Sequence, residues 1–212
     1  MNAEELIQKY DAGERDFTGI QIIRGDLKDL DLRGANFTNA SFKGRVDFRG
    51  ANLSGTNFTN AYLAGANLGN VDLSRANCRD VYLSGAELEE VNFTGADLTN
   101  ADLSGTNLNS GVFLNANLRK TYFYESFSRG TIFYGANIDD VVIMDCTFHA
   151  FNFTKATLRR ARMEHLTLRN CIFIKTDLTG ASGWSYVNTD FAVFKDTILP
   201  DGSSCNLNNG RR

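Results

Sequence analysis

Large apolar residues recur every five positions through most of the chain, each with a small residue two places earlier and polar residues around it. The pattern is plain in residues 51–55 (ANLSG) and 96–100 (ADLTN). Stepping by five from Phe48 to Leu178 visits 27 central positions, and only Ser128 among them is neither apolar nor Cys. A period of five fits neither a strand nor a helix, so the chain is predicted to follow a repeat geometry of its own.

The repeat predicts a coil built from extended triplets and corners. If the small residue and the large residue two places later face the same side, the triplet that they bound is extended. The other two residues, usually Ser or Thr followed by Gly or Asn, turn the chain. Repetition winds residues 15–180 into one solenoid whose coils pair with the coils above and below. The step lengthens to six once, from Phe42 to Phe48, which predicts a one-residue bulge near 43–45 at Gly44.

The Ala-Asp/Asn-Leu-x-x phrase resembles the repeat of the pentapeptide-repeat proteins, with 6 repeats before the insertion and 27 after it. The resemblance implies an all-β fold: a right-handed quadrilateral parallel β-helix of about eight coils, each with four repeats, or about 20 residues. Positions 20 apart then stack, and one column places phenylalanine rings in a ladder inside one wall. That column reads Leu53, Leu73, Phe93, Phe113, Phe133, Phe153, Phe173.

The two ends carry other signals. Residues 1–14 are predicted to form a helical cap, because Asn2 and Glu5 fit a capping box and Gly13 suits a helix stop. The five-residue phase is lost after Leu178. Residues 181–202 are interpreted as a C-terminal closing segment with a turn at 200–203, and residues 203–212 as a disordered tail.

Four residues deviate from the repeat. Ser128 stands where Leu or Phe belongs, and the neighbouring Phe127 stands where a polar residue belongs, so we expect a local bulge that turns Phe127 inward. Phe151 and Leu166 fill slots for small residues, which predicts a wider coil towards the C-terminal end.

Composition narrows the class of protein. The first residues are acidic where a signal peptide needs bases, no stretch approaches 18 apolar residues, and the formal charge of −3 gives no case for nucleic acid or an acidic membrane. Cys78, Cys146 and Cys171 fall in inward slots, with Cys205 in the tail. Free thiols in a reducing cytosol are the preferred interpretation, so a cytoplasmic location is expected.

No catalytic, metal-binding or cofactor motif is evident. His149 and His165 fall at outward positions without a shared column, and the chain has no Cys-x-x-Cys, no P-loop and no calcium-binding nonapeptide pattern. We therefore expect a protein that is not an enzyme and holds neither a metal nor a cofactor.

Some outward positions are apolar, which makes them the candidate partner surface. The alternative is that β-branched and aromatic side chains simply suit the outer face of a sheet. The candidate residues are Tyr62, Tyr82, Val112, Leu114, Tyr122, Tyr124, Ile132, Tyr134, Val142 and Met144.

Charge is uneven along the chain. Residues 71–105 hold seven acids and two bases, whereas residues 155–175 hold six bases and one acid. Opposite charges at the two ends of a rod would steer a partner or favour head-to-tail stacking of rods. The alternative is that these charges are the usual random distribution of a solvated surface.

These features predict a non-enzymatic scaffold or protein-protein interaction module that binds another protein through an exposed apolar wall. No small-molecule substrate, nucleic acid or membrane is expected, and self-association is compatible with the pattern. The helical N-terminus before Asp16-Phe17 and the residues 199–202 (LPDG) resemble cyanobacterial members of the family, which adds a regulatory role through a protein partner.

The alternative is mimicry of DNA. Family members that bind type II topoisomerases and protect them from quinolones resemble duplex DNA by an acidic rod surface, and they dimerise through an apolar C-terminal module. This chain departs from them, since it is nearly neutral, its basic segment 155–175 would repel the basic topoisomerase surface, and its tail 206–212 is polar.

Overall fold

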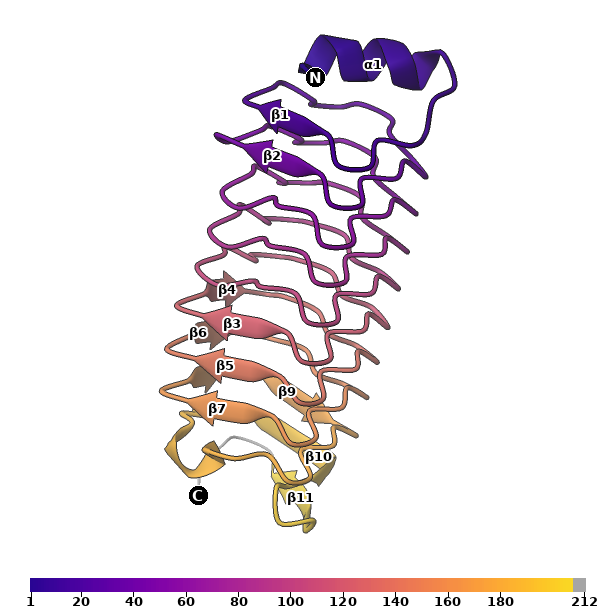
Figure 1. Ribbon diagram of the computed structural model, residues 1–212. Coiled ribbons are helices and arrows are strands. Elements are labelled where there is room, and N and C mark those ends of the chain that lie inside the picture. Colours follow the sequence, from indigo (N-terminus) through magenta and orange to yellow (C-terminus); the bar gives the residue numbers. More distant parts are fainter. Residues whose placement is uncertain (208–212) are drawn as a thin grey trace.

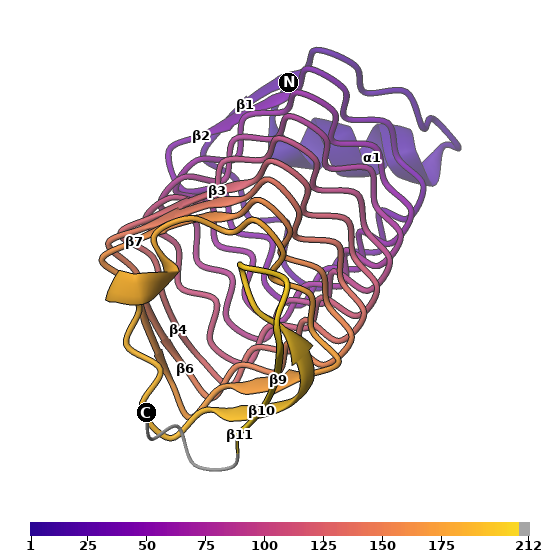
Figure 2. The same cartoon turned by 90° about the horizontal axis from the view of Figure 1, so that it is seen from below.

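The computed structural model describes residues 1–207, which wind into a four-sided parallel β-solenoid of about nine turns (Figures 1 and 2). Residues paired between successive coils are 20 apart through most of the chain, as in Asn52 with Asp72 and Asp72 with Asn92. The predicted β-helix is confirmed, with about one turn more than the eight expected.

Corner chemistry explains why the repeat turns where it does. The last residue of most repeats has a positive φ, for example 57° at Asn60 and 65° at Gly55. Asn, Asp and Gly tolerate this left-handed conformation best. The polar residue before the central one also holds the corner: the Asn57 side-chain oxygen accepts hydrogen bonds from the Thr59 backbone N–H at 3.0 Å and from its hydroxyl at 2.6 Å.

Each coil contributes one repeat to each of four walls. The walls are numbered in the order in which the chain passes through them, so the first and third walls are opposite each other (Figure 2). Three of them are named after a characteristic residue type. By their outward residues they are the phenylalanine wall (Asn92, Val112, Ile132), the asparagine wall (Asn57, Asn77, Asn117), the tyrosine wall (Tyr62, Tyr82, Tyr122) and the fourth wall (Asn67, Glu87, Asn107).

Some coils pair over three residues or more and so form short strands. Strands β1 (Gln21–Ile23), β2 (Ser41–Lys43), β3 (Tyr122–Tyr124), β5 (Val142–Met144) and β7 (Arg162–Glu164) belong to the tyrosine wall. Strands β4 (Phe127–Arg129), β6 (Thr147–His149) and β8 (Thr167–Arg169) belong to the fourth wall. Strands β9 (Ile172–Ile174), β10 (Val193–Ile198) and β11 (Ser204–Leu207) form one sheet on the phenylalanine wall. The intervening coils pair through single bridges.

Phenylalanine rings stack along the inside of the phenylalanine wall. Centroids lie 5.1 Å apart between Phe93 and Phe113, 4.7 Å between Phe113 and Phe133, and 5.6 Å between Phe133 and Phe153. Phe173 continues the column at 5.1 Å from Phe153. The ladder predicted from positions 20 apart is therefore confirmed.

The prediction for Ser128 is wrong. Ser128 points inward and is 4% exposed, whereas Phe127 is 51% exposed and points outward. The buried hydroxyl is satisfied by a hydrogen bond with the Thr131 hydroxyl, which in turn donates to the Leu108 carbonyl oxygen at 2.9 Å. Because the hydroxyl has partners in the core, no bulge is needed, and the normal register pairs Ser128 with Phe148.

The large residues in small slots are accommodated by the core. Phe151 and Leu166 are both buried. The Phe151 ring stacks on Phe148 with centroids 4.5 Å apart and lies 5.6 Å from Phe133. Its volume therefore extends the aromatic packing beside the ladder.

The inserted residue near 43–45 changes the register once. Pairs that span it are 21 apart, as in Ser41 with Tyr62, and the spacing returns to 20 from Asp47 with Asn67. Gly44 and Arg45 both have a positive φ, 73° and 62°. The extra residue is thus absorbed at a corner, and the walls beyond it continue undisturbed.

Helix α1 (Ala3–Asp11) lies across the N-terminal end of the solenoid (Figure 1). The Asn2 side-chain oxygen accepts a hydrogen bond from the Glu5 backbone N–H at 2.8 Å. Leu6 is fully buried, and the Tyr10 hydroxyl donates to the Arg33 carbonyl oxygen at 2.9 Å. The helix thereby covers apolar side chains that the first coil would otherwise expose.

The C-terminal segment continues the solenoid further than expected. Ser182 pairs with Arg162 at a spacing of 20, and Asn188 pairs with Thr167 at 21, so one residue is inserted near the short helix η1 (Trp184–Tyr186). Gly183 begins this insertion with φ 76°, and an added Cβ would come within 1.7 Å of the Met163 carbonyl oxygen. The five-residue repeat therefore continues here with a shift of one residue, whereas the sequence pattern predicted that the repeat ends after Leu178.

Strand β11 ends the described chain. It pairs antiparallel with β10, and Cys205 on it is buried. The interpretation of residues 203–212 as a disordered tail is therefore wrong for Ser204–Leu207, which cover the last parallel strand, and residues 208–212 lie outside the described residues. No helix in residues 1–207 is long and apolar enough to cross a membrane.

Candidate interaction surface

The candidate surface residues divide between two opposite walls. Six of the ten lie on the tyrosine wall, and four lie on the phenylalanine wall. The four on the phenylalanine wall are Val112, Leu114, Ile132 and Tyr134. A single flat partner cannot contact both groups, because the solenoid core lies between the two walls.

The tyrosine wall exposes large aromatic side chains. Tyr62, Tyr82, Tyr122 and Tyr124 are 41%, 49%, 52% and 45% exposed. The rings of Tyr62 and Tyr82 lie 6.4 Å apart between centroids, and the Lys43 ammonium lies 5.9 Å from the Tyr62 ring. Val142 and Met144 extend the same face on β5 and are half-buried. These six side chains lie on one face of the rod, in two groups on either side of the coil that carries Asp102.

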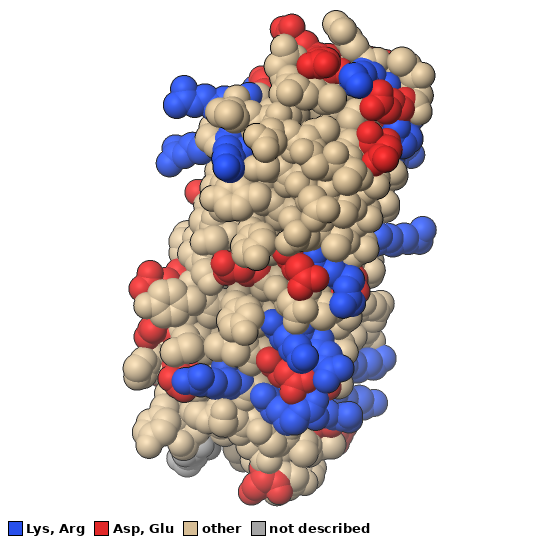
Figure 3. All heavy atoms as spheres, in the orientation of Figure 1, with Lys and Arg blue, Asp and Glu red and all other residues tan. Residues whose placement is uncertain are grey.

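Small neighbours leave these tyrosines accessible. Beside Tyr62 and Tyr82, the next outward positions hold Ala64 and Ser84, and the corners hold glycines. Figure 3, in which the strands of the tyrosine wall face the viewer, shows a broad uncharged area between charged side chains toward either end. Neutral aromatic surface of this kind is typical of contact surfaces.

The phenylalanine wall presents its apolar residues differently. Val112, Leu114, Ile132 and Tyr134 are all half-buried, and the Lys155 ammonium lies 5.0 Å from the Tyr134 ring. Side chains that bury each other along a stacked wall match the outer-face packing that β-branched residues favour. Their role as a partner surface stays a prediction.

Several exposed apolar residues were missed. Ile23 on β1 is 71% exposed and adds to the tyrosine wall, and Phe127 is 51% exposed on the fourth wall. Both occupy outward slots of the repeat, so the repeat phase alone was sufficient to find them. Tyr186 and Phe191, 81% and 59% exposed, lie beyond the register shift at Gly183, which concealed their slots.

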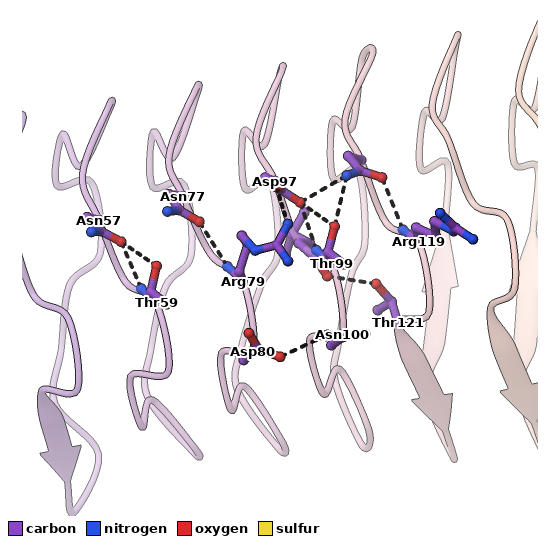
Figure 4. Close-up of polar contacts among 12 residues, drawn as sticks. Asn57, Thr59, Asn77, Arg79, Asp80, Asp97, Thr99, Asn100, Arg119 and Thr121 are labelled. Carbon is purple, nitrogen blue, oxygen red and sulfur yellow. Dashed lines mark hydrogen bonds and ion pairs between the residues drawn. The ribbon is translucent and has the colours of Figure 1, made fainter.

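The asparagine wall is polar and internally satisfied (Figure 4). The Asn117 side-chain amide donates to Asp97 at 3.1 Å and to the Thr99 hydroxyl at 2.8 Å, and the Arg79 guanidinium pairs with Asp97 at 3.2 Å. Hydrogen bonds within and between coils engage side-chain oxygens along this wall, as at Asn57 and Asp97. Groups that are bonded to their own wall are less available to a partner.

Ion pairs within the chain neutralise much of the basic segment. Arg159 pairs with Asp177 at 2.7 Å, and Arg160 pairs with Asp140 at 2.7 Å. The Asp140 carboxylate also accepts from Arg119 at 2.9 Å, and these guanidinium groups, that of Arg160 first, hold the pKa of Asp140 well below its usual range. The predicted excess of positive charge at 155–175 is thus partly cancelled by acids from neighbouring coils.

The acidic segment is spread around the rod. Asp72, Asp97 and Asp102 lie on three different walls, and Glu87 and Glu89 lie on the fourth. A hollow of about 680 Å³ on the fourth wall has Glu87 and Glu89 on one side and Arg45 and Arg49 on the other, with a glycine-lined floor. No wall is uniformly acidic.

Catalytic and metal chemistry find no support in residues 1–207. The described side chains include no group of three His, Cys, Asp or Glu that could hold a metal ion. His165 is a surface residue whose Nδ1 lies 3.0 Å from Asp145. All four cysteines are free and buried, and burial raises the pKa of Cys78 to about 12.

Comparison with known proteins supports this architecture. The family model described as Pentapeptide repeats matches in eight copies, over residues 16–44, 45–77, 76–113 and 152–182. A search of the curated proteins finds no match. Among solved structures, HetL, a pentapeptide repeat protein involved in heterocyst differentiation regulation from the cyanobacterium Nostoc sp. strain PCC 7120, is 25% identical. That likeness covers 97% of this chain and 100% of HetL, with a TM-score of 0.50.

Two further solved structures are more distant. Rfr23, a pentapeptide repeat protein from the cyanobacterium Cyanothece 51142, is 23% identical over 74% of this chain and 99% of its own, with a TM-score of 0.35. QnrB1, a plasmid-mediated fluoroquinolone resistance protein, is 20% identical over 90% of this chain and 89% of its own, with a TM-score of 0.40.

Proposed function

The chain belongs to the pentapeptide-repeat family, and from that premise we propose that it is a non-enzymatic scaffold that binds a partner protein through its tyrosine wall. The observation that carries the proposal is the exposure of Tyr62, Tyr82, Tyr122 and Tyr124 on one face of a rigid rod. A wall of stacked coils is already ordered before it meets a partner.

Tyrosine suits such a role for physical reasons. It buries a large apolar area on contact, loses little rotamer entropy, and carries a hydroxyl that can bond to a partner. The backbone beneath these rings is paired above and below, as in Tyr62 with Tyr82 and Tyr122 with Val142. A partner that binds here therefore meets a surface that does not need to be ordered first.

A regulatory role through a protein partner is the form of scaffolding that we favour. HetL, whose likeness covers nearly the whole of this chain, is described as involved in regulation of heterocyst differentiation. We place the protein in the cytosol, because its four cysteines are free and buried, as is usual where thiols stay reduced.

Mimicry of DNA is less well supported than scaffolding. A DNA-like rod needs acids in a continuous surface, whereas Asp72, Asp97, Asp102 and Glu87 point from four different walls. In a gyrase supercoiling assay we expect neither inhibition nor protection from quinolones.

The test of the scaffold is affinity capture from the native cytosol with the full chain as bait. The variant Tyr82→Glu with Tyr122→Glu places charge in the centre of the tyrosine wall, and Val112→Glu with Ile132→Glu does the same in equivalent slots of the phenylalanine wall. We expect a partner to be captured by the wild type and by the second variant, and to be lost with the first. Loss with the second variant alone would move the site to the opposite wall, and capture of no specific partner by the wild type would refute the proposal.

A further inference from the structure

The two halves of the tyrosine wall differ in a complementary way. Between Lys43 and Glu164, the column of outward residues that follows each central residue begins with a base and small side chains and ends with large side chains and an acid. It reads Lys43, Ala64, Ser84, Ser104, Tyr124, Met144, Glu164, and the exposed Ile23 precedes Lys43 in the first coil. Ser104 stands at the middle of this series.

We propose that the tyrosine wall binds the same wall of a second copy of this chain, with the two rods antiparallel. The two-fold axis lies in the plane of contact and runs along the coil that contains Ser104. The proposal rests on the proposed function in one respect, because both assign binding to this wall. It goes further by naming the partner and the register.

Shape supports this register. The coils are evenly stacked. A two-fold axis at Ser104 therefore places each coil of one copy opposite the coil of the second copy that lies equally far from the axis on the other side. Ser84 of one copy then faces Tyr124 of the other, and Ala64 faces Met144. Each large side chain meets a small one, which allows the two faces to interdigitate.

Charge supports the same register. Three coils from the axis, Lys43 of one copy faces Glu164 of the other, which also pairs with Arg162 of its own chain at 2.7 Å, and the symmetry makes this contact twice. Beside the large residues, the corner positions hold Glu125 and Asp145, and the positions opposite them hold Gly85 and Gly65, which leave room. A parallel arrangement would set Lys43 against Lys43 and large residues against large ones.

Aromatic contacts fill the centre. A second column of outward residues is formed by those that precede each central residue. In it, Asp102 is paired with Tyr82 of the preceding coil and with Tyr122 of the next. The same axis sets Tyr82 against Tyr122 of the second copy and Tyr62 against Val142. Aromatic side chains near the middle of a contact contribute most of its energy.

The size of the wall sets the expected strength. Seven coils at ~4.8 Å each span about 34 Å, and a three-residue wall with its corners is roughly 10–12 Å wide. The face of each copy, roughly 340–410 Å², is smaller than that of a typical stable dimer, so we expect a weak dimer whose population rises with protein concentration up to several hundred micromolar.

Asp102 is the one unfavourable element at the axis, since it meets Asp102 of the second copy. Its side-chain oxygen accepts a hydrogen bond from the Ser104 backbone N–H at 3.0 Å, and Asn52 does the same for Ser54 at 3.1 Å in another coil. Asp102→Asn therefore preserves the corner and removes the repulsion. We expect this variant to dimerise more tightly than the wild type, and weaker dimerisation would contradict the register.

Charge reversal tests orientation by sedimentation velocity. Lys43→Glu and Glu164→Lys, each alone, place like charges opposite each other at both ends and should weaken the dimer at least tenfold. An equimolar mixture of the two variants restores opposite charges at both ends, so we expect a heterodimer to form. The orientation follows from the single variants, because a parallel arrangement already sets like charges against each other in the wild type and would not be weakened by either reversal. A wild type that stays monomeric at several hundred micromolar, or a mixture that does not associate, would overturn the proposal.

A cross-link tests the position of the axis. On mild oxidation, Ser104→Cys should form a disulfide between the two copies, because position 104 of one copy faces position 104 of the other at the axis. Ser74→Cys on the opposite wall is the matched control, since its N–H also donates to a preceding Asp, at 2.9 Å. The four native cysteines are buried. Equal cross-linking of the two variants would refute the register.

These outcomes separate the two proposals. A monomeric protein whose captured partner is lost with Tyr82→Glu and Tyr122→Glu would leave the scaffold standing and overturn the dimer. A dimer with the expected charge rescue and no other captured protein would support the dimer and overturn the wider scaffold.

Discussion

The rings of Phe113 and Phe133 stack with their centroids 4.7 Å apart and their planes 20° apart. Phe133 also stacks on Phe153, so its ring is a middle member of the ladder. Phe133→Ala should lower the free energy of unfolding by roughly 3–5 kcal/mol, because it leaves a cavity between two rings. The urea unfolding midpoint, followed by circular dichroism, measures this.

The control for this prediction is Phe127→Ala. Phe127 is 51% exposed and stacks with no other ring in the described structure, so its removal should change the midpoint little. Equal effects of the two substitutions would show that the ladder does not stabilise the fold.

Thr131 should matter more to stability than Ser128, although both are buried. The Thr131 hydroxyl donates to the Leu108 carbonyl oxygen and also bonds to Ser128. Thr131→Val therefore leaves the buried Ser128 hydroxyl without its partner, whereas the Leu108 carbonyl oxygen keeps the Gly111 backbone N–H at 2.9 Å. We expect a cost of about 1–3 kcal/mol for Thr131→Val and a smaller one for Ser128→Ala, since Thr131 keeps its carbonyl partner in that variant. Urea midpoints that rank the two variants in the opposite order would contradict this view of the buried hydroxyls.

The buried thiols should be unreactive in the folded protein. Burial raises the pKa of Cys78 and of Cys171 to about 12 and that of Cys146 to about 11. These groups therefore remain protonated at pH 8, where only thiolates react. A chromogenic disulfide reagent should label Cys78, Cys146 and Cys171 in urea and not in buffer. Rapid labelling of Cys78 in buffer would mean that the central coils open readily.

Acid should remove the contribution of Asp140 to stability. Its folded pKa lies below the unfolded value of about 3.9, so its stabilisation is present above that value and is lost as the pH falls through the folded pKa. Asp140→Asn lacks this effect at every pH. We expect the wild type to have the higher urea midpoint at pH 7 and the difference to narrow steadily as the pH falls from about 5 to about 2. A difference that does not change with pH would show that the ion pairs with Arg119 and Arg160 do not stabilise the fold.

Much of the fold follows from the sequence because burial leaves so little choice. A small and a large residue two places apart must both face inward, and the corner residue must adopt a positive φ, which Asn, Asp and Gly do most readily, as at Asn60. These two requirements determine the coil, and stacking at 20 residues then determines the ladder around Phe133.

The local exceptions depend on contacts between coils. Ser128 remains in the core because Thr131 and the Leu108 carbonyl, which belongs to the preceding coil, satisfy its hydroxyl network. The register shift after Leu178 depends on Gly183, where the Met163 carbonyl leaves no room for a side chain. Neither contact has a signature in the local sequence pattern.

The candidate surface was only partly predictable for a similar reason. The repeat phase assigns Tyr122 and Val112 to outward slots on opposite walls, and the structure agrees. Their exposure differs because exposure depends on the neighbours stacked above and below. Tyr122 is 52% exposed, whereas Val112 is half-buried.

The spacing of 20 residues that most paired positions share has an evolutionary consequence. Duplication or deletion of one such unit in the interior adds or removes one row on every wall and leaves helix α1 and strands β10 and β11 unchanged as end pieces. The length of the rod can therefore vary by mutation in single-row steps without a new core. Each row of the surface can also diversify independently of the rows beside it, so this fold permits binding patterns to be extended, shortened or rewritten one line at a time.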